Sequence, residues 1–250
     1  MPFFRFTALT CCLAVLPYQT VSAQQSAPQG FLYGVGIGVN QEIYQGYRQR
    51  VIPLPVLGYR GDKLSVYGPF ISYKLADLGN FTISAKLAPR FAGFDSSDSD
   101  IFTGMAKRKN AIDAGIAVQL RQQQWLLEAE TLYDVLGHSK GNETKLNISY
   151  QVRQGPVVIE PKFGISYADS RLVDYYYGVR IDEATSTRAA YEASGTVNYN
   201  AGVAISTPVL FGGMTRLGIE HHWYGSSIGN SPLTDRDSGL SAFLTWSRMF

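Results

Sequence analysis

The chain alternates between apolar and polar residues along much of its length, up to its last residue. Leu240, Ala242, Leu244 and Trp246 fall on one side of the final segment, and the residues between them are mostly small or polar. A period of two is that of a β-strand, whose successive side chains point to opposite faces. Because the pattern runs to a terminal aromatic residue, Phe250, it predicts the last strand of an outer-membrane β-barrel.

One residue of this final segment departs from the pattern. Arg248 lies on the side that would face lipid. We expect it close to the membrane interface, where a long side chain can place its charge in water.

The same alternation recurs along the chain. Clear segments cover residues 31–40, 112–121, 125–135, 145–153, 157–167, 197–206 and 216–223. Weaker segments cover 51–59, 63–73 and 81–91, and residues 175–180 fit either a short strand or part of a long loop. Helical periodicity is absent from the clear segments. Since bacterial single-chain barrels have even strand numbers, we predict an all-β transmembrane antiparallel barrel of about twelve strands, with ten as the alternative, closed by the C-terminal strand.

Two prolines interrupt one weak segment. Pro53 and Pro55 lie two residues apart within 51–59. Proline has no N–H to donate to a neighbouring strand. The segment is therefore expected to be irregular or to pair poorly on one side.

The N-terminal residues have the features of a secretory signal peptide. A short positively charged start precedes an apolar stretch over residues 6–16, which is too short to span a bilayer. Small residues up to Ala23 suit a cleavage site, so we predict a signal peptide over 1–23 and one barrel domain over 24–250. Both cysteines, Cys11 and Cys12, lie in the part to be removed, so we expect neither a disulfide nor a cysteine nucleophile in the mature chain.

Composition agrees with a barrel but does not by itself predict one. The hydrophobic fraction of 45% would suit a soluble enzyme as well. The counts of 16 Tyr, 13 Phe and 25 Gly are more informative, because aromatic residues gather at membrane interfaces and glycines permit tight turns. A net charge of +2 provides no strong basic field, so no nucleic-acid partner is expected.

Charged residues of both signs fall on the faces expected to line the lumen. They are Lys86, Arg90, Arg121, Glu128, Glu130, Asp134, Lys145, Arg153, Glu160, Lys162, Arg216 and Glu220. Such a set forms either the lining of a selective pore or cross-strand ion pairs that fill a narrow lumen. We favour the second interpretation, because a dozen strands enclose little space once long side chains interdigitate.

Candidate chemistry is sparse. His221 and His222, followed by Ser226, Ser227 and Ser231, suggest a hydrolase, but neighbours in sequence do not establish a nucleophile within reach of a base. We predict that Glu220 and His222 are structural and that the chain has no catalytic, cofactor-binding or metal-binding residues. Residues 99–109 fit a short amphipathic helix or, as we prefer, a solvated loop. Leu244, Trp246 and Phe250 are expected to form the signal for outer-membrane assembly.

Several short motifs resemble the MipA/OmpV family of outer-membrane proteins. In chain order they are Gly34-Val35-Gly36-Ile37-Gly38, Tyr44-Gln45-Gly46, Pro53-Leu54-Pro55, Tyr59-Arg60, Tyr176-Tyr177-Gly178-Val179, Glu183-Ala184, Tyr191 and Asn230-Ser231-Pro232-Leu233. Each is weak alone, but their order along the chain is more specific.

The resemblance implies a barrel in the cell outer membrane, in contact with its lipid. The best-known member is a scaffold that bridges a lytic murein transglycosylase to a bifunctional penicillin-binding protein, and other members are adhesins or antigens. No catalytic residues come with the family. The leading hypothesis is therefore a non-enzymatic scaffold for peptidoglycan-remodelling enzymes, and the alternatives are a small-solute channel or a surface adhesin.

Overall fold

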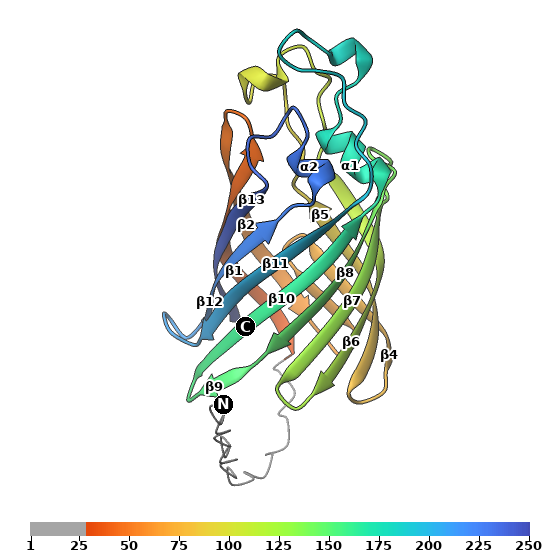
Figure 1. Cartoon of the computed structure of the whole chain (residues 1–250). Coiled ribbons are helices and arrows are strands. Elements are labelled where there is room, and N and C mark those ends of the chain that lie inside the picture. Colours follow the sequence, from red (N-terminus) through yellow and green to blue (C-terminus); the bar gives the residue numbers. More distant parts are fainter. Residues whose placement is uncertain (1–28) are drawn as a thin grey trace, which may run out of the picture.

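The computed structural model describes residues 29–250, which form a closed antiparallel β-barrel (Figure 1). The strands are β1 (Gly30–Tyr44), β2 (Tyr47–Arg60), β3 (Leu64–Tyr67), β4 (Phe70–Asp77), β5 (Phe81–Arg90), β6 (Ala111–Gln122), β7 (Trp125–Asp134), β8 (Asn142–Tyr150), β9 (Val152–Gln154), β10 (Val157–Ala168), β11 (Thr196–Thr207), β12 (Met214–Trp223) and β13 (Ser238–Met249). The short helices are η1 (Asp100–Phe102), α1 (Ser170–Tyr177), η2 (Ile181–Glu183) and α2 (Ser226–Gly229). The predicted signal peptide over 1–23 lies outside the described residues.

The thirteen strand segments make twelve strands. β8 and β9 both pair with β10 and lie end to end, separated only at Gln151, so they count as one strand. β13 pairs with both β12 and β1, over a register that runs from Leu32 opposite Met249 to Asn40 opposite Ser241. The predictions of twelve strands and of closure by the C-terminal strand are confirmed.

The ends of the barrel differ, and this difference orients it. Gly30 and Met249 are at one end, where most of the connections are short, while residues 91–110, 169–195 and 224–237 form long connections at the other. Outer-membrane barrels have short periplasmic turns and longer extracellular loops. The long connections are therefore extracellular. Among residues 29–250, no helix is long and apolar enough to cross a membrane.

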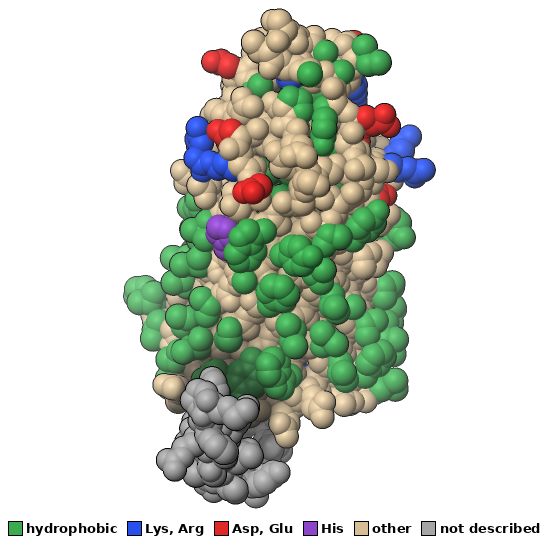
Figure 2. Space-filling view, in the orientation of Figure 1, with side chains coloured by type: hydrophobic (Ala, Val, Ile, Leu, Met, Phe, Trp, Pro, Cys, Tyr) green, Lys and Arg blue, Asp and Glu red, His purple; other side chains and the backbone are tan. Residues whose placement is uncertain are grey.

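Apolar side chains cover the outside of the barrel wall (Figure 2). Exposed large hydrophobic residues occur on nearly every strand, among them Val35, Leu57, Ile116, Phe163, Val203 and Leu244. Charged side chains gather near the extracellular end instead (Figure 2). In water such a surface would be unfavourable, but in a bilayer it meets acyl chains, so the predicted lipid face is confirmed.

Two segments depart from the predicted strand pattern. Residues 63–73 form the β3–β4 hairpin rather than a single strand, because Gly68 adopts a φ of 56° and Pro69 follows it, a pair that makes a turn. The first half of the uncertain segment 175–180 belongs to helix α1, and the second half to the loop after it. The helix begins after Asp169, whose carboxylate caps it by accepting a hydrogen bond from the Leu172 N–H.

β2 pairs fully on one side only. It lies against β1 along its whole length but against β3 only from Gly58 to Arg60. The prediction that the segment containing Pro53 and Pro55 pairs poorly on one side is confirmed.

Candidate functional site

The first part of the candidate site is a network of ion pairs inside the barrel, on the wall formed by β5–β8. The ammonium group of Lys86 lies 3.0 Å from Glu128 and 2.9 Å from Glu130. Arg90 binds Asp113 at 2.6 Å and Glu143 at 3.0 Å. Since Arg90 is on β5 and Glu143 on β8, its side chain crosses two intervening strands.

Lys145 completes this network. Its ammonium group lies 3.6 Å from Glu130 and 3.4 Å from Glu143. Every pair in the network joins side chains on different strands, except Lys145 and Glu143, which are both on β8. The charges therefore hold four strands together and occupy space within the lumen.

A second group of contacts lies on the wall formed by β10–β13. Lys162 pairs with Glu220, which also accepts a hydrogen bond of 2.6 Å from the amide of Asn200. Arg216 binds Glu160 at 2.9 Å. These contacts also join different strands, so both halves of the lumen carry compensated charge.

The structure brings together most of the predicted lumen charges. The residues that form cross-strand ion pairs are Lys86, Arg90, Glu128, Glu130, Lys145, Glu160, Lys162, Arg216 and Glu220. Arg121 and Arg153 form no ion pair with any described residue. Asp134 does not join the network either, because it accepts hydrogen bonds from the backbone of the β7–β8 loop, including the Ser139 N–H at 2.6 Å.

Two members of the network were missing from the predicted set. Asp113 and Arg121 lie an even number of residues apart on one strand, so they face the same side of the sheet. The sequence alone was therefore sufficient to place Asp113 in the lumen. Glu143 lies two residues before Lys145, but the predicted strand began at 145, so the boundary error removed it.

The second part of the site is a cap of extracellular loops. A buried ion pair fastens it: Arg108 donates to both carboxylate oxygens of Glu183, at 2.9 and 2.7 Å. The two side chains are only 2% and 3% exposed. Arg108 also donates to the carbonyl of Tyr175, and Glu183 accepts from the backbone N–H of Ala106.

The surroundings of Glu183 favour its ionised form. Burial raises the pKa of its carboxyl, but the hydrogen bonds from Arg108, Ala106 and Arg180 and the positive charge of Arg108 outweigh burial and bring the pKa down to about 2. Glu183 is therefore a charged anchor at neutral pH. Its backbone carbonyl also accepts from Arg188, which reaches across to the carbonyl of Thr103.

Apolar packing joins the cap to the top of the barrel. Phe102 and Leu233 are fully buried, and Phe94 stacks on Phe102 with ring centroids 3.9 Å apart. Tyr44, from the end of β1, packs into the same cluster and donates to the carbonyl of Tyr176. The preferred prediction of a solvated loop over 99–109 is therefore wrong: only η1 is helical, and Phe102 and Met105 are buried.

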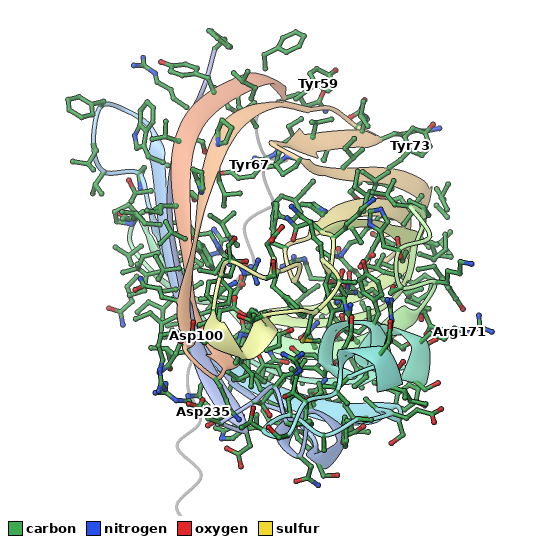
Figure 3. All side chains as sticks on the ribbon, turned by 90° about the horizontal axis from the view of Figure 1, so that it is seen from above. Tyr59, Tyr67, Tyr73, Asp100, Arg171 and Asp235 are labelled. Carbon is green, nitrogen blue, oxygen red and sulfur yellow. The ribbon has the colours of Figure 1, made fainter. Side chains whose placement is uncertain are left out.

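The cap lies at the extracellular end of the barrel (Figure 1). In the view from above, its residues Asp100 and Asp235 lie on the side opposite Tyr59 and Tyr73 of β2 and β4 (Figure 3). Within the cap, residues around Arg108, Tyr175 and Tyr191 line an open pocket of about 590 Å³.

The residues whose neighbourhood in sequence suggested a hydrolase do not come together. Ser227 contacts Ser194, and Ser231 donates to the carbonyl of Tyr177, so both serve the cap. His222 instead lies 2.9 Å from Ser241, a contact that sequence neighbours did not indicate.

His222 and Ser241 lie within hydrogen-bond distance, as a catalytic base and its nucleophile must. The pair lacks a carboxylate that orients the histidine and a pair of N–H donors for an oxyanion. The carboxylate that would orient the histidine, Glu220, is 4.0 Å away and is engaged by Lys162. Ser241 is paired with strands on both sides, opposite Asn40 and Glu220, so its backbone supplies no free pair of N–H donors for an oxyanion. The described residues contain no group of three or more His, Cys, Asp or Glu suited to a metal ion.

Of the residues predicted as an assembly signal, Trp246 and Phe250 lie at the periplasmic end of the chain's last strand, whereas Leu244 lies in the middle of β13. Phe250 is 86% exposed, and its N–H donates to the carbonyl of Phe31 on β1. Trp246 donates to the carbonyl of Leu210 in the β11–β12 turn. Arg248 donates to the carbonyl of Phe211 in the same turn, which places its charge at the periplasmic rim as expected.

Comparisons with known proteins agree with this geometry. Residues 33–250 match a family model described as MltA-interacting protein MipA. The chain is 27% identical to the outer membrane protein Omp26La of Vibrio anguillarum, over 91% of this chain and 93% of that protein. It is 27% identical to the outer membrane protein OmpV of Vibrio cholerae, over 71% and 70% of the two chains.

The chain also matches a further relative and a solved structure. The chain is 26% identical to the MltA-interacting protein of Escherichia coli, over 62% of this chain and 63% of that protein. Among solved structures, the toluene transporter TbuX of Ralstonia pickettii aligns with 90% of each chain at a TM-score of 0.44 and 8% identity. The family match covers most of the chain, and the strand order and apolar wall are those of an outer-membrane barrel. The chain therefore belongs to the MltA-interacting protein MipA family and is an outer-membrane β-barrel protein.

Proposed function

We propose that this protein is a non-enzymatic interaction protein of the outer membrane that acts as a scaffold for peptidoglycan-remodelling enzymes, namely a lytic transglycosylase and a penicillin-binding protein. The observation that carries the proposal is that the barrel interior is occupied by compensated charge. Arg90 and Lys145 each bind two carboxylates, so moving either of them would break two ion pairs at once. Such a lumen favours a rigid support over an open pore.

The cap supports the same proposal. Its loops form one packed unit, because Phe102 and Leu233 are buried and Arg108 is held by Glu183, and a rigid unit suits a support. The absence of an oxyanion site beside Ser241 argues against turnover. A relative named MltA-interacting protein, at 26% identity, directs attention to a murein hydrolase as one partner.

The periplasmic turn between β11 and β12 is the surface that we assign to the partner. Leu210 and Phe211 have positive φ values of 69° and 50°, a conformation that costs a non-glycine residue about 1–2 kcal/mol. Trp246 and Arg248 hold the turn in this form through hydrogen bonds to its carbonyls. Phe211 is 84% exposed at the end of the barrel that faces the cell wall.

A photo-crosslinking amino acid at position 211 tests the proposal in intact cells. We expect it to capture a lytic transglycosylase or a penicillin-binding protein. The matched control is the same amino acid at Ile181, which is 89% exposed but lies in the extracellular cap. Position 181 should capture neither enzyme. Failure of position 211 to capture either enzyme would contradict the proposal.

Conductance separates the scaffold from the channel alternative. Purified protein in planar bilayers should give no steady openings, because the ion pairs and the cap obstruct the axial path. Reproducible single-channel currents that increase in an Arg90→Ala variant would instead support a small-solute channel.

A further inference from the structure

The extracellular cap has a pocket that the proposed scaffold role does not use. This is the open pocket of about 590 Å³, which is lined by residues of α1, of the β7–β8 loop and of the segments 178–181 and 190–192. Small-molecule sites range over roughly 300–1,000 Å³, so the pocket is large enough to hold a ligand. Because it opens at the extracellular end of the barrel, its ligand must come from outside the cell or from the outer leaflet of the membrane.

Basic side chains surround this pocket, and two of them have no acidic partner among the described residues. Arg171 and Arg180 line the pocket, and Lys140 follows the lining residue Ser139. Arg171 and Lys140 are exposed and form no ion pair with any described residue. Arg180 approaches Glu183 at 3.9 Å, which is too far for a hydrogen bond. These cationic groups are therefore available to an anion that reaches the pocket.

Lys140 and Arg171 belong to one surface, although they lie on different loops. The Asp169 N–H donates to the carbonyl of Asn142 at 3.0 Å, and the Asn142 amide donates to the carboxylate of Asp169 at 2.9 Å. These bonds join the start of β8, just after Lys140, to the residue that precedes α1. In the view from above, Arg171 lies at the edge of the molecule and points away from the barrel (Figure 3). Its charge therefore faces the surrounding membrane surface rather than the barrel mouth.

The lipid-facing wall ends close to this basic surface. Tyr133, near the end of β7, is exposed, and so are Val135 and Leu136 in the loop that contains Lys140. Exposed aromatic residues at the end of a membrane strand are typical of the membrane interface. Since Lys140 comes after these residues in the same short loop, its ammonium group is close to the level of the lipid head groups.

Two tyrosine rings of the pocket are held in place through their hydroxyl groups. The Tyr175 hydroxyl accepts from the backbone N–H of Lys109 at 2.9 Å, and the Tyr191 hydroxyl donates to the carbonyl of Ser227 at 3.0 Å. Both side chains line the pocket and are partly exposed. An aromatic ring can pack against the apolar face of a sugar, and a ring that is already fixed loses little side-chain entropy when the ligand binds.

Carboxylates also line the pocket, and they restrict the ligand. Asp174 accepts from the Ala193 N–H at 2.9 Å, so it serves the cap. Glu192 is exposed and forms no ion pair with any described residue. It can accept hydrogen bonds from sugar hydroxyl groups, but it would repel a simple anion. The lining therefore suits a ligand that has both hydroxyl groups and an anionic group.

We propose that this pocket binds a phosphorylated sugar of the lipopolysaccharide that surrounds the barrel in the outer leaflet. The sugar ring packs against Tyr175 and Tyr191, and Glu192 accepts from its hydroxyl groups. Arg171 and Lys140 bind the phosphate. Lipopolysaccharide fits the position of the pocket, because its phosphorylated sugars lie just outside the acyl chains that cover the barrel wall. The scaffold role does not depend on this site, so each proposal can fail alone.

The basic surface is tested by native mass spectrometry of the folded protein with lipopolysaccharide that has a phosphorylated core. The double variant Lys140→Gln, Arg171→Gln should weaken binding about tenfold, because it removes two charged donors. The matched control, Arg48→Gln with Arg236→Gln, removes the same charge beside Asp235, on another side of the cap (Figure 3). The control should bind as the wild type does. Equal losses in the two double variants would indicate general attraction by charge and would overturn the site.

A second pair of variants tests the pocket itself. Ala189 and Ala190 are neighbouring exposed residues, but Ala190 lines the pocket and Ala189 does not. Ala190→Trp should fill the pocket and reduce binding, whereas Ala189→Trp should not. Both positions are exposed, so both variants should fold, and the gel mobility of unboiled samples verifies this. Unchanged binding in folded Ala190→Trp would place the lipopolysaccharide outside the pocket.

Modified ligands test which part of the lipid is recognised and where it comes from. Lipopolysaccharide whose phosphates have been removed should bind the wild type about tenfold more weakly, and the variant without Lys140 and Arg171 should lose this preference. Glucose 6-phosphate at an equal concentration should not displace the lipid. Equal wild-type binding of the two lipopolysaccharides would exclude recognition of the phosphate. Displacement by glucose 6-phosphate would instead assign the pocket to a soluble sugar phosphate and overturn the membrane source.

Discussion

Arg108 and Glu183 are 75 residues apart in the chain, yet they form a two-hydrogen-bond ion pair that is buried in the extracellular cap. The pair joins the loop after β5 to the loop after β10. Because both loops also contribute to the aromatic cluster around Phe102, the ion pair and the apolar packing stabilise the same unit.

Removing one partner of this pair should loosen the cap. Arg108→Ala leaves the Glu183 carboxylate buried without its cation, which costs about 3–5 kcal/mol. We expect much faster cleavage within residues 169–195 in limited proteolysis, with the barrel itself intact. The neighbouring Lys107 provides the control: its ion pair with Asp95 is exposed, so Lys107→Ala should change the cleavage rate little. Equal effects of the two variants would contradict the assignment.

The same pair predicts a pH dependence. The pKa of Glu183 is lowered from 4.5 to about 2, so its ionised form is stabilised in the folded cap. The resulting stability is fully present above pH 4.5 and is lost as pH falls toward 2. Hydrogen exchange of the cap should therefore accelerate across this window. Glu183→Gln should exchange faster at neutral pH and lack the component that titrates there; a wild-type profile in this variant would exclude Glu183 as the cause.

The C-terminal residue should matter for assembly more than for stability. Phe250 is largely exposed, with its ring near Tyr33, and deleting it removes one backbone hydrogen bond, the one to Phe31. We expect lower outer-membrane levels in cells, while refolded protein keeps nearly the wild-type melting temperature. Phe211→Ala, which removes an equally exposed aromatic side chain at the same end, should leave these levels unchanged. Normal levels after deletion would show that Phe250 is not part of the signal.

Glu220 should be a structural residue of the lumen. Glu220→Ala leaves Lys162 without its ion-pair partner and frees the amide of Asn200. We therefore expect the free energy of unfolding to fall by about 1–3 kcal/mol and the melting temperature to fall with it. Ser241→Ala should have a smaller effect, because it removes one hydrogen bond to His222.

The histidine contact also permits a direct test of catalysis. Folded wild-type protein should hydrolyse neither phospholipid nor nitrophenyl esters, because Ser241 lacks an oxyanion site. Robust hydrolysis that disappears in both His222→Ala and Ser241→Ala, with the barrel still folded, would overturn the non-enzymatic function.

Alternation along the chain was sufficient to predict the barrel, because strands that separate lipid from lumen must alternate. Leu244 and Trp246 were placed on the outer face, and Lys86, Glu128 and Glu220 on the inner face, from parity alone. The same reasoning failed at 63–73, where alternation continues through Gly68 and hides a turn. It also failed for Glu143, because the predicted strand began too late.

By itself, then, the sequence determined the periodic part of this protein: the strands, their two faces, the closing C-terminal strand and the weak side of the segment with Pro53 and Pro55. The tertiary structure alone decided the rest. The cap depends on contacts such as that of Arg108 with Glu183. The loops that contain these residues have no periodic pattern from which the contact could be predicted. How far the β3–β4 hairpin reaches beside β2 and β5 is also set by pairing in space, which no local pattern encodes.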